Sequence, residues 1–191
     1  MLSQMRYPAD QKQRTSQRIL DTASNLFRSR GYEATGIDAV MASAGLTAGG
    51  FYAHFRSKED LLARALESSF RQSGSSWSKR LVNLKGSEWV RGFVNVYLSK
   101  AHRDNPDHGC PMPALAPEIG RIEGPSRKVF EQYLRGLIEM VGKQVGRDRA
   151  ISAIALCVGG LMLARAAEDP KLSDRILSAC RAAVIQDSAE A

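Results

Sequence analysis

The chain has 191 residues, 43% of them hydrophobic and 25% charged, which is the composition of an ordinary folded protein with a buried core. Its formal net charge of +7 at pH 7 favours polyanionic partners, because cations that neutralise phosphates release counter-ions. Three widely spaced cysteines argue against a disulfide framework and for a reducing cytoplasm, and the first residues lack the apolar run of a secretory signal.

The N-terminal part predicts an arm over residues 1–10 followed by a helix over residues 11–30. The apolar residues of this helix recur at intervals of three and four, namely Ile19, Leu20, Ala23, Leu26 and Phe27. This spacing predicts one buried face. Gly31 is expected to end the helix, because glycine readily adopts the left-handed conformation that follows a helix.

A short second helix is predicted after Thr35, which stands where an N-cap belongs. Ile37, Val40 and Met41 follow at helical spacing and predict its buried face. Gly45 then predicts a tight turn, because its conformational freedom allows the chain to reverse.

Thr47 is expected to cap a third short helix, in which Phe51 and Phe55 share the buried side. Gly49 and Gly50 lie inside this helix, where each costs about 1 kcal/mol relative to alanine. Such a pair suits a helix that another surface approaches closely. A helix, a glycine turn and a second helix form the pattern that places the second helix in the DNA major groove, and the alternative is a three-helix hairpin without DNA binding.

The rest of the chain also predicts helices and no strands. A fourth helix begins after the N-cap Ser57 and extends to residue 81 or 84. The later helices are expected at residues 87–103, 111–119, 126–145, 147–167 and 170–186. Residues 150–164 are apolar nearly all round, but the run is shorter than the roughly 20 residues of a membrane span, which predicts a buried helix and no membrane contact. The fold class is therefore all-α.

Residues 11–66 resemble the N-terminal domain of the TetR family of transcriptional regulators. The matching positions are Ile19-Leu20 to Phe27, Gly31-Tyr32, Thr35, Ala44-Gly45-Leu46-Thr47, Gly49, Phe51-Tyr52, His54-Phe55, Ser57-Lys58-Glu59 and Leu61-Leu62. The resemblance implies a helix-turn-helix DNA-binding domain over residues 1–56, with its arm at 1–10. It implies a helical effector-binding and dimerisation domain over residues 57–191.

The resemblance also implies a set of DNA-binding residues: Thr35, Thr47, Ala48, Gly49, Gly50, Tyr52, His54 and Lys58. The two threonines are expected to bind backbone phosphates. The small residues should let the recognition helix sit deep in the groove, where Tyr52 contacts a base or a phosphate. Lys58, at a helix N-terminus, is expected to clamp a phosphate with the free backbone amides. The basic arm, which contains Arg6, either reaches DNA or is a solvated tail.

The implied partners are a near-palindromic double-stranded operator, a second copy of the chain and a small effector that releases the DNA. The dimer is expected through residues 147–167 and 170–186. The effector is expected to be apolar or aromatic, in a pocket lined by aromatic and methionine side chains between the fourth and eighth helices. The expected location is the bacterial cytoplasm, at the nucleoid. The alternative is a ligand-independent DNA-binding protein that organises the chromosome.

Cys110 is a further candidate, because a thiol before a helix N-terminus has its pKa lowered by the helix dipole. Two interpretations of Cys110 follow. It is a switch that senses electrophiles or oxidants, or it is a packed structural residue. His102 and His108 lie nearby, but their spacing to Cys110 matches no zinc pattern. No arrangement of nucleophile and base, paired carboxylates or phosphate loop points to an enzyme, and no cofactor is expected.

Overall fold

The protein is helical throughout the part that its structure, a computed structural model, describes: residues 9–189, without the side chains of 9, 76–78 and 189. The elements are α1 (Ala9–Arg30), α2 (Ile37–Ser43), the 3₁₀ helix η1 (Ala48–Ala53), α3 (Lys58–Leu81), α4 (Gly86–Tyr97), α5 (Lys100–Asp104), the 3₁₀ turn η2 (Pro106–His108), α6 (Met112–Ile119), α7 (Pro125–Val145), α8 (Arg147–Ala166) and α9 (Pro170–Ala189). The all-α prediction is confirmed.

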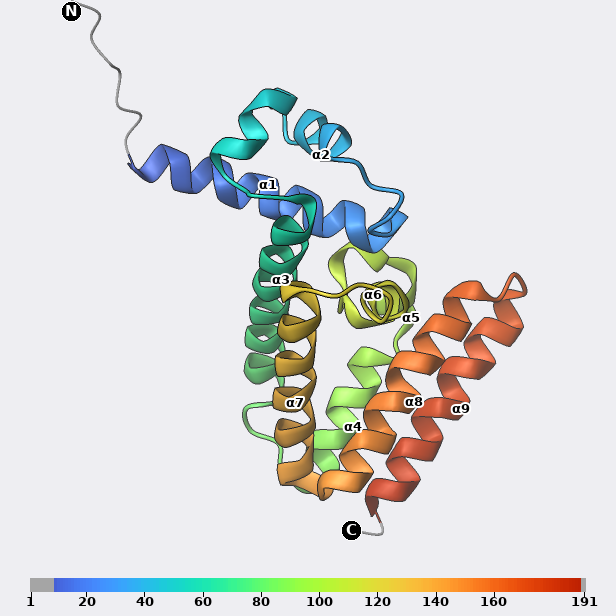
Figure 1. Ribbon diagram of the computed structural model, residues 1–191. Helices are drawn as coiled ribbons and strands as arrows, with labels where there is room; N and C mark the ends of the chain where they lie inside the picture. Colours follow the sequence, from blue (N-terminus) through green and yellow to red (C-terminus); the bar gives the residue numbers. More distant parts are fainter. Residues whose placement is uncertain (1–8, 190–191) are drawn as a thin grey trace, which may run out of the picture.

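A small head and a longer body make up the molecule. Helices α1 and α2 and the η1 segment form the head, and α3 leads from it into a body in which α4, α7, α8 and α9 run side by side (Figure 1). The short α5 and α6 lie between the two, where α6 contacts α1 as well as α8. The apolar face predicted for α1 is buried, with Ile19, Ala23 and Phe27 at most 1% exposed.

Several helix ends follow the sequence signals. Ser57 caps α3, since its hydroxyl accepts the Asp60 backbone N–H at 3.0 Å. Asp169 precedes α9, and its carboxylate accepts the backbone N–H groups of Lys171 and Leu172. Gly45 has the positive φ of +67° that the turn after α2 requires.

The helix predicted over residues 87–103 is wrong, because the chain breaks between Tyr97 and Lys100. Ser99 starts a new helix there: its hydroxyl accepts the His102 backbone N–H at 3.1 Å and caps α5. The apolar periodicity continues across this break, and a serine inside an apolar pattern predicts a helix cap only weakly. The sequence therefore predicted one continuous helix.

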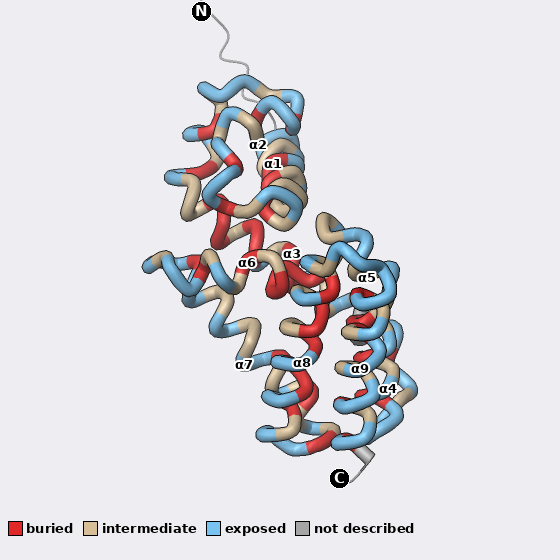
Figure 2. The backbone as a smooth tube through the Cα atoms, turned by 90° about the vertical axis from the view of Figure 1, so that its right-hand side faces the viewer, coloured by how far each residue is buried: buried red, intermediate tan, exposed pale blue. Residues whose placement is uncertain are grey.

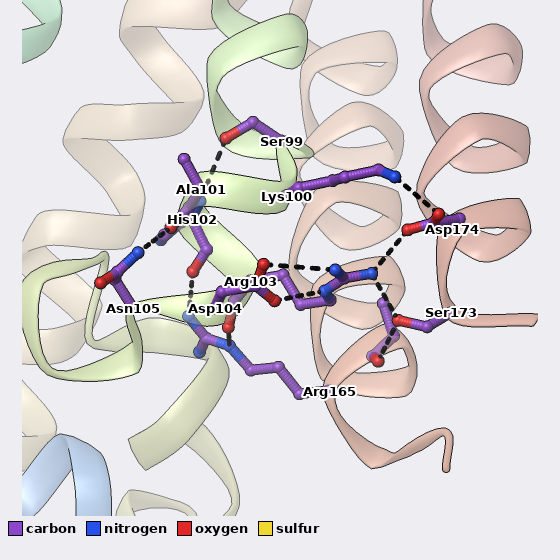
Figure 3. Close-up of polar contacts among 11 residues, drawn as sticks. Ser99, Lys100, Ala101, His102, Arg103, Asp104, Asn105, Arg165, Ser173 and Asp174 are labelled. Carbon is purple, nitrogen blue, oxygen red and sulfur yellow. Dashed lines mark hydrogen bonds and ion pairs between the residues drawn. The ribbon is translucent and has the colours of Figure 1, made fainter. Parts of the chain in front are cut away.

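The short α5 is fastened to the C-terminal helices by polar contacts (Figure 3). Arg165 of α8 donates to the carbonyls of His102 and Arg103, at 2.6 and 3.1 Å. Arg103 in turn donates to Asp174 and Ser173 of α9, at 2.8 and 2.9 Å. These bonds satisfy the carbonyls of a helix too short to bond them itself.

Helix α8 lies where the sequence predicted it and ends one residue earlier, at Ala166. It spans 20 residues with a mean hydropathy of 1.5 in its most apolar window, so by length and composition alone it could cross a membrane. The prediction of no membrane contact, made from the shorter apolar run at residues 150–164, stays a prediction. The helix instead packs between α7 and α9, and 39% of that window is buried within this chain.

Candidate nucleic-acid interface

The α2–turn–η1 unit is held from beneath by an apolar layer. Val40 and Met41 are 1% exposed, and Phe51 and Phe55 are 0% and 2% exposed. The two phenylalanine rings stack with their centroids 5.7 Å apart. Because these four side chains point inward, the opposite face of η1 is fixed toward solvent.

The outer face of η1 carries small residues and one large ring. Thr47, Ala48 and Gly49 are exposed, and a Cβ added at Gly49 would meet nothing within 4 Å. Tyr52 projects from this face with 71% of its surface exposed, although its ring also meets Phe51 edge-on at 5.1 Å. The backbone of η1 is therefore open to close approach, with Tyr52 as its one long side chain.

Neither threonine caps its helix as the sequence predicted. Thr47 occupies the N-cap position of η1, but its side chain makes no capping hydrogen bond. Gly36, rather than Thr35, is the N-cap of α2. Thr35 is 2% exposed, and its hydroxyl donates to the Gly31 carbonyl at 2.7 Å. That bond, made inside the loop between α1 and α2, removes the hydroxyl from the surface.

Lys58 stands at the start of α3, beside the head. Its ammonium group lies 4.2 Å from the centroid of the Tyr32 ring and donates to the Glu33 carbonyl at 3.3 Å. The Asp60 carboxylate accepts the Arg56 backbone N–H at 3.0 Å. Because the Ser57 hydroxyl also takes the Asp60 N–H, part of the expected amide clamp is already occupied.

His54 follows η1 and is half-buried. Desolvation by burial is the main cause that lowers its pKa, so the neutral imidazole is favoured. Arg64 of α3 donates to the His54 carbonyl at 3.0 Å and lies over the Phe55 ring, 4.6 Å from its centroid. These contacts fix the passage from η1 to α3. The arm, with Arg6, lies outside the described residues.

The aromatic and methionine side chains expected around an effector are core residues instead. Trp89, Phe93, Tyr97, Met112 and Leu115 are each at most 7% exposed. The expectation of an apolar effector pocket lined by such side chains stays a prediction. A cavity of about 480 Å³ lies between α1, α3, α4, α5 and η2, and its lining is rich in arginine, serine, asparagine and histidine.

Cys110 lies at the edge of this cavity with 3% of its surface exposed. Burial raises the pKa of its thiol, although the Met112 backbone amide and the Tyr97 hydroxyl act in the opposite direction. The expectation of a lowered pKa is therefore wrong, because desolvation outweighs the helix terminus. The neighbouring His102 uses both ring nitrogens, Nδ1 with the Tyr97 carbonyl and Nε2 with the Cys110 N–H.

Comparison with known proteins places this geometry in a family. Residues 19–65 match the profile described as "Bacterial regulatory proteins, tetR family". The chain is 24% identical over 139 residues to the transposon Tn10 TetC protein of Escherichia coli. This alignment covers 73% of this chain and 69% of the TetC protein. It is 24% identical over 149 residues to the transcriptional repressor NemR of Escherichia coli K12. This alignment covers 75% of this chain and 73% of NemR.

Solved structures share the fold over almost the whole chain. A TetR transcriptional regulator from Chloroflexus aurantiacus has a TM-score of 0.78 at 24% identity and covers 93% of this chain and 95% of its own. The reduced form of Escherichia coli NemR has a TM-score of 0.75 at 21% identity, with 90% and 95% covered. The matched profile spans the helix-turn-helix unit described above, and the chain belongs to the TetR family of transcriptional regulators.

Proposed function

We propose that this regulator binds double-stranded DNA through the outer face of η1, as a homodimer on a near-palindromic operator, and releases it when a small molecule binds the body. The exposed, side-chain-poor surface of η1 with Tyr52 at its centre is the observation that carries the proposal. A backbone that no side chain covers can approach a duplex closely, and duplex phosphates favour a chain of net charge +7.

The proposed contacts are Thr47, Ala48, Gly49, Gly50, Tyr52, His54 and Lys58. Thr35 is left out, because its hydroxyl is buried and bonded to the Gly31 carbonyl. Tyr52 is placed to meet a base edge or a phosphate. Lys58 would exchange its bond to the Glu33 carbonyl for a phosphate oxygen, which is the stronger, charge-assisted partner.

The decisive experiment selects bound sequences from genomic fragments and then measures affinity for the selected site by fluorescence anisotropy. We expect one inverted repeat. Tyr52→Ala should lose about 1–3 kcal/mol of binding free energy. Lys58→Ala should reduce the slope of log K against log salt by about one, because one phosphate contact is removed.

The matched control is Arg147→Ala, which removes an exposed cation from the start of α8, at the end of the body opposite the head (Figure 1). It should leave both the affinity and the salt slope at the wild-type values. Equal losses in Arg147→Ala and Lys58→Ala would mean that only net charge matters. Binding to many unrelated fragments with no shared repeat would favour the alternative, a chromosome-organising protein.

The exposed faces of α8 and α9 support the homodimer. On α8, Ser152, Leu156, Gly159 and Leu163 fall on one side of the helix and are exposed or half-exposed, with Leu163 62% exposed. On α9, Leu172 is 51% exposed. Figure 2 looks onto this side and shows pale exposed positions along both helices. Small and apolar residues in a stripe allow two helix pairs to pack closely.

The dimer is tested by sedimentation. Leu163→Glu should shift the protein to a monomer at micromolar concentration, because the change places a charge in the apolar stripe. Val82→Glu is the control, since Val82 is 72% exposed but lies at the end of α3. A monomeric wild-type protein, or equal dissociation of both variants, would contradict the proposed interface.

A further inference from the structure

The cavity between head and body is large enough for a small metabolite. Its volume of about 480 Å³ lies within the range of roughly 300–1,000 Å³ typical of ligand pockets. Ser24 and Arg28 of α1 line one side, and Ser69 and Arg80 of α3 line another. Because α1 belongs to the head and α3 leads into the body, a molecule bound here would touch both.

Arg28 is the most unusual group in this cavity. Its guanidinium donates only to neutral acceptors: the Asp107 carbonyl at 2.8 Å, the Ser69 hydroxyl at 3.0 Å and the Asn25 side-chain oxygen at 2.7 Å. Desolvation by burial is the main cause that lowers its pKa. Among the ion pairs formed by the described residues, none joins Arg28 to a carboxylate. A half-buried cation with no carboxylate in direct contact favours an anionic ligand, although the charges of Asp107 and Asp21 act on it from farther away.

The remaining lining fits one negative charge on a small apolar body. Ser73 and Gln72 add a hydroxyl and an amide, and Val96 adds apolar surface. Asp21 is the one carboxylate among the lining residues, and it accepts a hydrogen bond from Gln17 at 2.9 Å. The Asp21 carboxylate would repel a second negative charge on the ligand. Because Arg80 is exposed, water weakens its attraction for such a charge. A monoanion therefore suits the site better than a phosphate dianion.

We propose that this cavity binds a small organic monocarboxylate, whose carboxylate oxygens accept hydrogen bonds from the Arg28 guanidinium. That this cavity is the effector site of a regulator rests on the proposed function. That the cavity binds a monocarboxylate does not. The ligand competes with the Asp107 carbonyl for Arg28. That bond joins α1 to η2, so occupancy of the cavity changes a contact between head and body.

The test measures binding without DNA, by calorimetry and thermal shift at fixed ionic strength. The probes are benzoate and hexanoate, their neutral amides benzamide and hexanamide, and phenyl phosphate. We expect each carboxylate to bind at least about tenfold more tightly than its amide, because only the anion makes charge-assisted hydrogen bonds. Equal binding of acid and amide, tighter binding of phenyl phosphate, or no binding of any probe would overturn the proposal.

Variants locate the site. Arg28→Gln should lower the affinity for benzoate about tenfold or more. Ser73→Phe should do the same by filling the cavity, while it leaves the contacts of Arg28 in place, so the test survives if Arg28→Gln does not fold. The control Arg127→Gln on α7 should bind as the wild type does. Unchanged benzoate affinity in a folded Arg28→Gln or Ser73→Phe protein, or an equal loss in the control, would overturn the proposed site.

Parallel anisotropy with operator DNA separates the two proposals. DNA binding without carboxylate binding would reject this cavity as a carboxylate site and leave the proposed function standing. Carboxylate binding that depends on Arg28, in a protein with no affinity for any duplex, would reject the proposed function and leave the site standing.

Discussion

At the scale of single residues, burial decides the chemistry of the groups near the cavity. His102 and Cys110 are neighbours whose polar atoms are bonded to each other and to Tyr97. A low dielectric around them disfavours charge on both, which lowers the pKa of the imidazole and raises the pKa of the thiol. The pair is thus a neutral, hydrogen-bonded junction between α4, α5 and α6.

His102 makes the stability of the protein sensitive to mild acid. Burial lowers the pKa of the folded imidazole below the unfolded value of about 6.5. Above that pH both states are neutral. As the pH falls from 6.5 toward the folded pKa, only the unfolded state takes up the proton, so the free energy of unfolding decreases. We expect the melting temperature to fall between pH 6.5 and 5, and to fall less in His102→Gln.

The control for this prediction is His108→Gln, which removes an exposed imidazole from η2. It should keep the acid sensitivity of the wild type. His54, whose pKa is also lowered, accounts for sensitivity that remains in His102→Gln. A pH profile identical in wild type and His102→Gln would show that this imidazole is not the sensitive group.

At the scale of helices, the approach of α8 to α9 depends on one glycine. A Cβ added at Gly160 would lie 2.7 Å from the sulfur of Cys180 and 3.0 Å from its Cβ. Both distances are shorter than normal contacts, and neither helix can move without disturbing its other neighbours. The small residue is therefore required by packing, even though glycine weakens a helix interior.

We expect Gly160→Ala to reduce the free energy of unfolding by about 1–3 kcal/mol, the usual cost of overpacking, as measured by urea denaturation. Gly136→Ala is the matched control on α7, where an added Cβ meets nothing within 4 Å. It should increase stability by about 0.5–1 kcal/mol through helix propensity. Equal stabilisation by both substitutions would contradict the close contact of α8 and α9.

At the scale of the whole molecule, a few polar contacts join the head to the body. The Glu118 carboxylate of α6 accepts the backbone N–H groups of Tyr32 and Glu33, at 2.8 and 3.1 Å, just after α1. Gly31 lies against the same carboxylate. Together with the Arg28 contacts, these two hydrogen bonds link the head to the body.

We expect Glu118→Ala to loosen the head without unfolding the body, because two backbone amides lose a charged acceptor worth about 1.5–3 kcal/mol each. Hydrogen exchange should become faster at Tyr32 and Glu33 and stay unchanged in α8. Glu123→Ala, an exposed carboxylate after α6, is the control and should alter neither region. Uniformly faster exchange across the chain would instead mean that Glu118 supports the entire fold.

Local signals in the sequence determined much of this protein. The periodicity of apolar residues determined most helices, Ser57 and Asp169 determined two helix starts, and Gly45 determined the turn, because each acts within one helical turn of itself. The run from Thr47 to Lys58 also carried the family resemblance that the tetR profile match confirms. These features depend on neighbours in the chain and need no knowledge of distant contacts.

Tertiary structure alone decided the rest. The Thr35 hydroxyl donates inward to the Gly31 carbonyl, burial raises the pKa of the Cys110 thiol despite the helix terminus, and several side chains expected near an effector are buried. The polar cavity around Arg28 joins residues of five separate elements, and no local pattern marks it. Burial, desolvation and the choice of hydrogen-bond partner depend on which segments pack together, so they are set only when the chain has folded.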